Sequence, residues 1–346
     1  MKLRPRALAG LALVAATSLG LAACGSSAPG TSSASGDKGT ITVYNAQHES
    51  LTKEWIDAFT AETGIKVNYR QGDDTEMSNQ IIQEGAASPA DVFLTENSPA
   101  MTQVENAGLF ADIDPATAAQ VPAEYRPSTN KWIGIAARST VFAYNKSKVS
   151  QDKLPKSLMD LQSPEWKGRW AASPSGADFQ AIVSAMLQLK GEDATKAWLQ
   201  ALKDGAKSYK GNSTAMKAVN SGEVDGAVIY HYYWFGDQAK TGENSKNVGL
   251  EYFKNQDPGA FVSVSGGGVL KSSKNQAAAQ EFLKFVTGKK GQEVLQKGSS
   301  YEYAVGSGVP SNSKLVPLEQ LQAPKIDPAK LNSQKVNELM TATGLL

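Results

Sequence analysis

Strand-like and helix-like segments alternate along most of this chain, and this alternation restricts the fold more than any other feature of the sequence. It begins with a strand over residues 40–46, an amphipathic helix that ends at Gly64 and a second strand over residues 66–70. A helix over residues 77–86 and an apolar strand over residues 91–95 follow. Such alternation is typical of α/β domains with largely parallel sheets.

Two longer extended segments, residues 132–145 and 261–270, interrupt the alternation. Between them lie a strand over residues 168–173, a helix over residues 178–191 and a strand over residues 226–230. Two such segments can each cross from one half of a molecule to the other, so the simplest architecture has two lobes, two crossovers and a cleft between the lobes. We expect one lobe to comprise residues 40–140 and 264–315, and the other to comprise residues 141–263 and 316–346.

The N-terminus has the pattern of an export signal over residues 1–23. Three basic residues within the first six positions precede an apolar stretch that is too short to span a bilayer comfortably. Its end, Leu21-Ala22-Ala23-Cys24, resembles the lipobox of bacterial lipoproteins, in which the cysteine is diacylated and becomes the first mature residue. Cys24 is the only cysteine of the chain, and two acyl chains suffice for a stable anchor. The alternative is an ordinary cleavable signal followed by an incidental cysteine.

Residues 24–39 are rich in Gly, Ser and Ala and predict a flexible tether. The whole chain has 35 Lys and Arg against 34 Asp and Glu, and removing the three basic residues of the signal leaves 32 against 34. Such a nearly neutral protein gives no indication of nucleic-acid binding. No second apolar stretch of about 18 residues follows, so we expect the remainder to be soluble, and we expect a monomer.

The candidate functional residues stand where predicted strands end and helices begin. In open parallel sheets, ligands bind beyond the carboxyl ends of the strands, where helix N-termini also present free amide groups. Four junctions carry unusual side chains, so we expect them to converge on the cleft. These side chains are His48, Glu96, the run Ser175-Gly176-Ala177, and the pair Tyr232 and Tyr233.

Taken singly, each candidate has an ordinary explanation. His48 can be a helix cap or a surface residue, and Glu96 can complement a helix dipole. The adjacent tyrosines can be core or rim aromatics, and both can reach one ligand only if the chain turns there. His231 would point opposite Tyr232 in a regular strand, so we leave it out of the site. Together, the four junctions favour a binding site.

Three segments make the chain resemble the ferric-binding periplasmic proteins, which have the α/β, two-lobed type II periplasmic-binding-protein fold and the bacterial transferrin arrangement. The segments are VYNAQHES, PADVFLTEN and AVIYHYYWF. The resemblance covers the chain from about Thr40 to the C-terminus and implies two crossover segments and an interlobe cleft. It also implies four ligands to a ferric ion, namely His48, Glu96, Tyr232 and Tyr233.

The chemistry of these four side chains agrees with that implication. Two phenolates, a carboxylate and an imidazole form a hard, oxygen-rich set that suits a small, highly charged cation better than zinc or copper(I). Because free tyrosine has a pKa of about 10, only a strongly Lewis acidic metal holds two phenolates at neutral pH. Four protein ligands leave about two octahedral positions for water or an anion.

In the family that anion is often phosphate, held by a Ser-Gly-Ala helix N-terminus and nearby asparagines. The matching residues here are Ser175, Gly176, Ala177 and Asn212. The alternative is structural, because Ser175 and Asp178 have the spacing of a capping box and Asp178 would repel a nearby anion. Tyr230 and His231 stand where asparagines commonly precede the tyrosine pair, so carbonate is also possible.

Arg138 lies in a segment that resembles an arginine-bearing crossover of the family. It is a candidate contact to the anion, although a solvated or hinge arginine is the other interpretation.

The resemblance implies an exported lipoprotein, in the periplasm or anchored to the outer face of the cell membrane, that delivers ferric ion to the permease and ATPase subunits of an ABC importer. We do not expect an enzyme. Two alternatives remain open. A binder of phosphonate, polyamine or another small solute would share the fold without needing all four ligands. An exported metal-dependent hydrolase would need a poised acid or base, and the sequence has no HExxH, GxSxG or paired-metal carboxylate cluster.

Overall fold

The computed structural model describes residues 39–306 and 308–346. The predicted signal peptide, Cys24 and the tether as far as residue 38 lie outside the described residues. Within the described ranges, no helix is long and apolar enough to cross a membrane.

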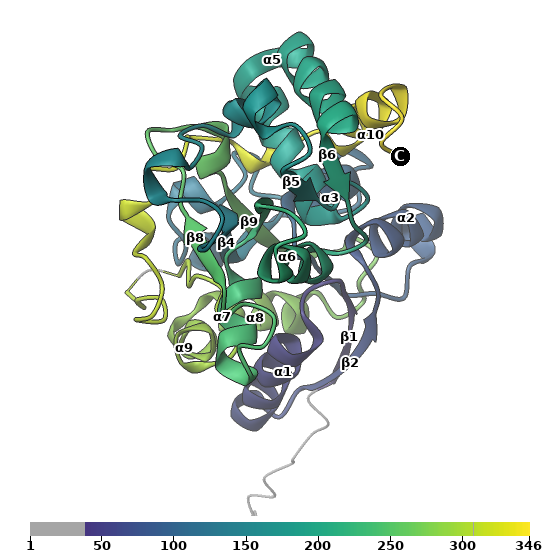
Figure 1. The fold of residues 1–346 in the computed structure, drawn as a ribbon. Helices are drawn as coiled ribbons and strands as arrows, with labels where there is room; N and C mark the ends of the chain where they lie inside the picture. The colour runs from purple at the N-terminus through teal and green to yellow at the C-terminus, as the bar shows by residue number, and fades with distance from the viewer. Residues whose placement is uncertain (1–38, 307) are drawn as a thin grey trace, which may run out of the picture. The chain divides into compact units, whose positions relative to one another are not determined.

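Within this described part, nine strands form one sheet in the order β2-β1-β3-β9-β4-β7-β5-β6, and β8 pairs with β4 (Figure 1). The strands are β1 (Thr40–Asn45), β2 (Lys66–Gln71), β3 (Val92–Leu94), β4 (Ile133–Asn145), β5 (Trp170–Ala172), β6 (Ala206–Ser208), β7 (Gly226–Tyr230), β8 (Val248–Glu251) and β9 (Val262–Val269).

The strand directions correct the expectation of a largely parallel sheet. β1 runs parallel to β2 and β3, and β5 runs parallel to β6 and β7. The two long predicted segments are β4 and β9, which pair with each other in antiparallel fashion, and β4 also pairs antiparallel with β7. The two parallel groups are therefore linked through an antiparallel centre, because both long strands cross between them.

Ten α-helices occur in the described residues. They are α1 (Glu49–Thr63), α2 (Asp74–Glu84), α3 (Ser98–Asn106), α4 (Pro115–Ala118), α5 (Ala177–Gly205), α6 (Asn212–Ser221), α7 (Tyr232–Lys240), α8 (Gln276–Thr287), α9 (Lys289–Lys297) and α10 (Ser333–Ala342).

Local sequence explains several helix boundaries. Helix α1 ends where Gly64 takes a left-handed φ of 75°, which glycine adopts at little cost. Helix α2 starts three residues earlier than predicted because the Asp73 side chain accepts a hydrogen bond from the backbone N–H of Glu76. Helix α5 is interrupted at Gly191, where φ is 80°, so it consists of two helical stretches.

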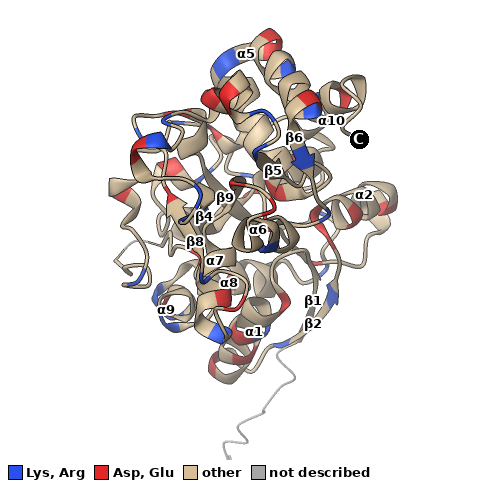
Figure 2. Ribbon diagram, viewed as in Figure 1, with Lys and Arg blue, Asp and Glu red and all other residues tan. Residues whose placement is uncertain are grey.

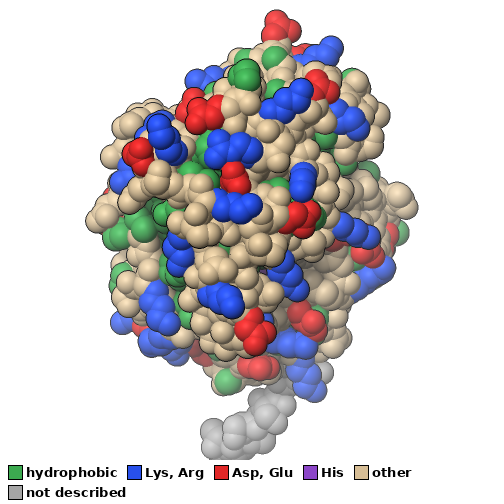
Figure 3. Space-filling model, in the orientation of Figure 1, with side chains coloured by type: hydrophobic (Ala, Val, Ile, Leu, Met, Phe, Trp, Pro, Cys, Tyr) green, Lys and Arg blue, Asp and Glu red, His purple; other side chains and the backbone are tan. Residues whose placement is uncertain are grey.

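Apolar side chains from both sheet faces form the core. One cluster packs α2 and α3 against β1, β3 and β9 and includes Met77, Phe93, Met101 and Trp132. Another packs α6 against β4, β5 and β7 and includes Val141, Met216 and Ile229. Basic and acidic residues are interspersed over the helices and over the visible surface, and no single sign dominates this face (Figures 2 and 3).

Candidate metal centre

The strand ends bring the predicted residues together. β1 and β3 are parallel neighbours, so His48, just beyond β1, and Glu96, just beyond β3, emerge at the same edge of the sheet. The carboxylate of Asp74 stabilises the turn after β3 by accepting hydrogen bonds from the backbone N–H groups of Glu96 (2.9 Å) and Asn97 (3.0 Å). The imidazole Nε2 of His48 lies 3.0 Å from Oε1 of Glu96.

His48 is the N-cap residue of α1, but its side chain makes no capping hydrogen bond. The capping interpretation is therefore wrong. The ring instead packs edge-on against Tyr232, with the ring centroids 4.9 Å apart.

The tyrosine pair opens α7, and the turn from β7 into this helix directs both rings to one side. Their centroids are 4.3 Å apart and the rings are stacked. The hydroxyls of Tyr232 and Tyr233 both donate to Oδ2 of Asp178, at 3.2 and 2.9 Å. Burial, and then the charge of Asp178, raises the pKa of each tyrosine well above its ordinary value. Both are therefore neutral phenols in the metal-free protein.

Asp178 contacts both tyrosines, which the capping-box interpretation did not foresee. The N-cap of α5 is Gly176 and no side chain caps this helix, so Ser175 and Asp178 do not form a capping box. The carboxylate of Asp178 instead accepts hydrogen bonds from the amides of Asn97 (2.9 Å) and Asn212 (2.8 Å) as well as from the tyrosines. One carboxylate thus holds both phenol hydroxyls and two amide groups together.

A pocket of about 240 Å³ opens beside Tyr233 and Glu96. Three of the five predicted anion contacts line it, namely Gly176, Ala177 and Asn212. Ser175 is exposed, and neither it nor Arg138 lines the pocket. Among the described residues, the lining includes four acidic residues, Asp73, Asp74, Glu96 and Asp178, and no Lys, Arg or His. The pocket therefore suits a cation better than a free anion.

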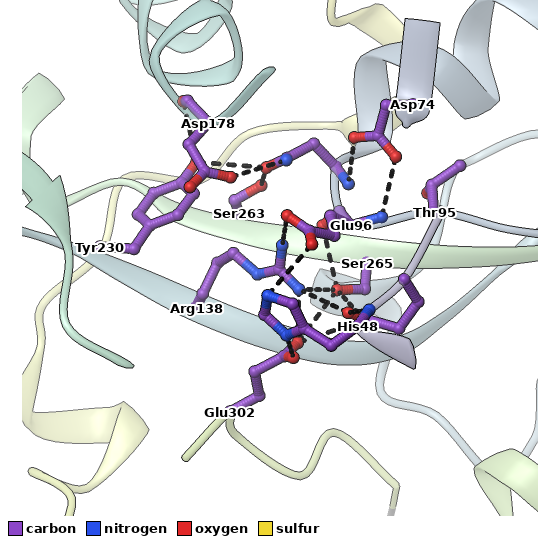
Figure 4. A network of polar contacts seen from close by, with 12 residues as sticks. His48, Asp74, Thr95, Glu96, Arg138, Asp178, Tyr230, Ser263, Ser265 and Glu302 are labelled. Carbon is purple, nitrogen blue, oxygen red and sulfur yellow. Dashed lines mark hydrogen bonds and ion pairs between the residues drawn. The ribbon is translucent and has the colours of Figure 1, made fainter. Parts of the chain in front are cut away.

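Arg138 is not solvated, so the interpretation as a solvated arginine is wrong. It is completely buried on β4, and its guanidinium lies between two carboxylates, Glu96 at 3.4 Å and Glu302 (Figure 4). The guanidinium also lies 5.4 Å from the ring centroid of Tyr232. These contacts engage Arg138 with protein carboxylates and do not place it in the lining of the pocket.

Glu302 was not predicted from the sequence. It is completely buried, and its Oε1 lies 2.8 Å from Nδ1 of His48, on the opposite side of the ring from Glu96 (Figure 4). The only sequence signal was a charged residue between two aromatic residues, Tyr301 and Tyr303, both of which are buried.

The surrounding charges set the protonation of the centre. Burial lowers the pKa of His48, but Glu96 and Glu302 more than offset this effect and raise it to about 9. Burial raises the pKa of Glu302, but Arg138 and His48 lower it to about 2. The pKa of Glu96 is raised by burial, although His48 and Arg138 oppose the shift. At neutral pH His48 is therefore an imidazolium.

His231 lies outside this set of side chains. It is completely buried, its Nδ1 accepts from the backbone N–H of Ser139 (3.1 Å), and its Nε2 donates to the carbonyl of Tyr301 (2.8 Å). Burial lowers its pKa to about 4. Both ring nitrogens are engaged by the backbone, so the residue has a structural function.

The chemical types of these donor groups suit a ferric ion. An imidazole, a carboxylate and two phenols converge, and their metal-binding atoms are hydrogen-bonded to Glu96, His48 or Asp178. Among the described residues, His, Cys, Asp and Glu side chains by themselves form no group of three placed to hold a metal ion. A candidate metal centre at this position therefore has to include the tyrosines.

Comparisons with known proteins agree with this chemistry. A family profile for bacterial extracellular solute-binding proteins matches residues 87–330. The Fe(3+)-binding periplasmic protein of Serratia marcescens is 64% identical over 346 residues, which cover 100% of both chains. The major ferric iron-binding protein of Neisseria meningitidis serogroup B is 37% identical over 308 residues, which cover 88% of this chain and 91% of that protein.

Solved structures show the same fold. Iron-bound HitA from Pseudomonas aeruginosa has a TM-score of 0.83 at 43% identity, covering 88% of this chain and 99% of that chain. Trichodesmium FutA in complex with iron and citrate has a TM-score of 0.75 at 26% identity, with the same coverage. These neighbours are type II periplasmic binding proteins, so the predicted fold class is confirmed, and the related proteins are named for iron binding rather than for catalysis. The chain therefore belongs to the bacterial extracellular solute-binding proteins, and within them to the family of ferric-binding periplasmic proteins.

Proposed function

We propose that this protein binds one ferric ion outside the cytoplasm through His48, Glu96, Tyr232 and Tyr233 and delivers it to the permease of an ABC importer. The observation that carries the proposal is the convergence of the two stacked phenols with the imidazole–carboxylate pair at the strand ends. The names of the relatives support the choice of cargo.

The state of the donors explains why a strongly acidic metal is needed. The His48 ring is paired with Glu96, and both tyrosine hydroxyls are bonded to Asp178, so binding has to replace these contacts. Two buried phenols with raised pKa values lose their protons only to an ion of high charge density. Ferric ion meets this requirement better than a divalent metal does.

Two oxygen sources can complete the coordination of the ion. One is a small anion such as phosphate or carbonate, held beside Gly176, Ala177 and Asn212. The other is the carboxylate of Asp178, which already lies within hydrogen-bond distance of both phenol oxygens. Because four acidic residues line the pocket, we favour Asp178 and treat the anion as an addition rather than a requirement.

Ferric titration of the purified protein tests the proposal. We expect a broad visible phenolate-to-iron charge-transfer band that saturates at one ion per chain, and binding that persists in buffer stripped of phosphate and carbonate. The Asp178→Asn variant should gain a dependence on added anion, because the amide supplies no negative charge. A colourless protein that binds zinc as well as ferric ion contradicts the ferric assignment. An anion requirement in the unmodified protein contradicts only the role of Asp178.

The membrane anchor is a separate part of the proposal. Cys24 lies outside the described residues, and its acylation rests on the Leu21-Ala22-Ala23-Cys24 pattern. We expect Cys24→Ser to move the protein from the membrane fraction to the soluble fraction, because the serine hydroxyl cannot receive the lipid that two-chain anchoring requires. Fractionation with mass spectrometry of the mature N-terminus measures this. Undiminished membrane association of a correctly processed variant would show that the cysteine is not the anchor.

A further inference from the structure

We propose that Glu302 is a positioning residue for ferric binding, whose carboxylate keeps the proton of the neutral His48 ring on Nδ1 and so leaves Nε2 free for the metal. The inference rests on the proposed function only in treating His48 as an iron ligand. The hydrogen-bonding part concerns the metal-free protein and is independent of iron.

The two oxygens of Glu302 have different partners. Oε1 lies 2.8 Å from Nδ1 of His48, and among the described residues this ring is its one side-chain hydrogen-bond partner. Oε2 accepts from the guanidinium of Arg138 and also lies near the amide of Gln47 (3.3 Å) and the hydroxyl of Ser265 (3.4 Å). An ionised carboxylate only accepts hydrogen bonds, so the nitrogen that faces Oε1 has to carry a proton.

The backbone fixes Glu302 in place from both sides. On one side, Tyr301 has a φ of 56°, which is rare for a residue with a side chain, and its carbonyl accepts from the ring of His231. On the other side, Tyr303 exchanges two backbone hydrogen bonds with Ala137 on β4, at 3.0 and 2.8 Å. The residues on both sides of Glu302 are therefore held by hydrogen bonds, and this fixes its carboxylate next to the His48 ring.

His48 needs such a partner because Nε2 also faces a carboxylate. Glu96 lies 3.0 Å from Nε2, is 23% exposed and lies 3.4 Å from Arg138, whereas Glu302 is completely buried and makes the shorter contact with Arg138. Without Glu302, the neutral ring would place its proton on Nε2 towards Glu96, and the lone pair needed by a metal would be occupied. Metal-bound histidines generally donate their other ring N–H to a carboxylate or carbonyl in this way.

The Glu302→Gln substitution separates the two roles of the carboxylate with little change in volume. A glutamine side chain has one accepting oxygen and one donating NH₂ group. Arg138, which only donates, claims the oxygen, so the NH₂ group faces His48 and pairs with an unprotonated Nδ1. The variant should therefore hold the neutral ring with its proton on Nε2.

The first measurement is nitrogen-15 NMR of both rings in metal-free protein, at a pH where the rings are neutral. The chain has only two histidines, and His231, which donates through Nε2, is an internal reference of the opposite tautomer. We expect an Nδ1-protonated His48 ring in the unmodified protein and an Nε2-protonated ring in Glu302→Gln. Finding the Nδ1-protonated ring in both proteins would overturn the proposal.

The second measurement is ferric affinity by competition with a chelator. Loss of an outer partner of a metal-bound histidine typically weakens binding by about 10–100-fold, and we expect Glu302→Gln to fall in that range. In a His48→Ala background the same substitution should change affinity little, because the ring through which it acts is absent. An equal loss in that background would overturn the proposal.

The matched control is Glu105→Gln. Glu105 accepts a hydrogen bond from the indole of Trp132 at 2.9 Å and is not one of the side chains of the candidate centre. The affinity of the Glu105→Gln variant for ferric ion should therefore match that of the unmodified protein. A loss there equal to that of Glu302→Gln would count against a specific role for Glu302. If the unmodified protein binds no ferric ion, the proposed function fails, while the tautomer measurement still decides the role of Glu302.

Discussion

Tyr232→Phe and Tyr233→Phe are each expected to weaken ferric binding by more than ~100-fold, which is the upper range for losing an outer partner of a metal ligand. Each substitution removes one phenolate oxygen but retains the ring, so the stacked pair, with centroids 4.3 Å apart, is preserved. The visible charge-transfer band should weaken in each single variant and disappear in the double variant. Absorbance titration and chelator competition measure the two effects.

The comparison variants separate ligation from packing. Tyr230→Phe is the matched control, because Tyr230 is a completely buried tyrosine whose hydroxyl makes only long contacts, at 3.3 and 3.4 Å. It should retain colour and affinity. His48→Ala and Glu96→Ala should lower affinity but leave the band, since neither side chain is the source of the charge transfer. An unchanged band in both tyrosine variants would contradict phenolate ligation.

The sequence was informative about these four residues because each follows a regular element. A strand that ends at Asn45 and a helix that begins at Glu49 fix the position of His48 from local patterns alone. The same holds for Glu96 after β3 and for the tyrosines after β7. The ends of neighbouring parallel strands meet at one edge of a sheet, so local prediction was sufficient to bring His48 and Glu96 near each other. β7 runs opposite to β3, with β9 and β4 between them, so the approach of the tyrosines to this pair is a tertiary contact that strand order alone does not predict.

The buried charges could not be predicted in the same way. Arg138 and Glu302 are 164 positions apart, and both are completely buried as an ion pair. Charged residues are usually exposed, so either residue taken alone suggests a surface position. Glu302 also lies outside any helix or strand, where no periodic pattern indicates which way a side chain points. The Ser175–Asp178 spacing, by contrast, gave a local signal for a cap that tertiary contacts with both tyrosines override.

The second large effect concerns pH, and its sign follows from the protons that the donors carry before metal binds. Tyr232 and Tyr233 have pKa values raised above the ordinary value, so both are protonated at neutral pH. The pKa of His48 is raised to about 9, so its ring is also protonated there. Binding through all three side chains releases one proton from each. Acidification therefore favours the metal-free protein, and affinity should fall as pH falls.

The expected slope distinguishes this centre from one with an ordinary histidine. Three protons released per ion make the affinity fall on the order of 10³-fold per pH unit through the neutral range. With the ordinary histidine pKa of about 6.5, the slope would be near two above that pH and would rise only below it. The ion pairs with Glu96 and Glu302 raise the pKa of His48, so its proton release adds to the pH dependence of ferric affinity already in the neutral range.

Competition against a chelator of known proton affinity at several pH values measures the slope, and His48→Ala is the matched variant. Removing the imidazole should reduce the neutral slope from about three to about two while both phenolates still bind. A slope unchanged by His48→Ala would mean that His48 enters the complex without losing a proton and is not a ligand. An affinity that stays flat between about pH 7.5 and 5.5 would exclude the tyrosines as well, because phenols of raised pKa cannot bind a metal as phenolates without releasing protons.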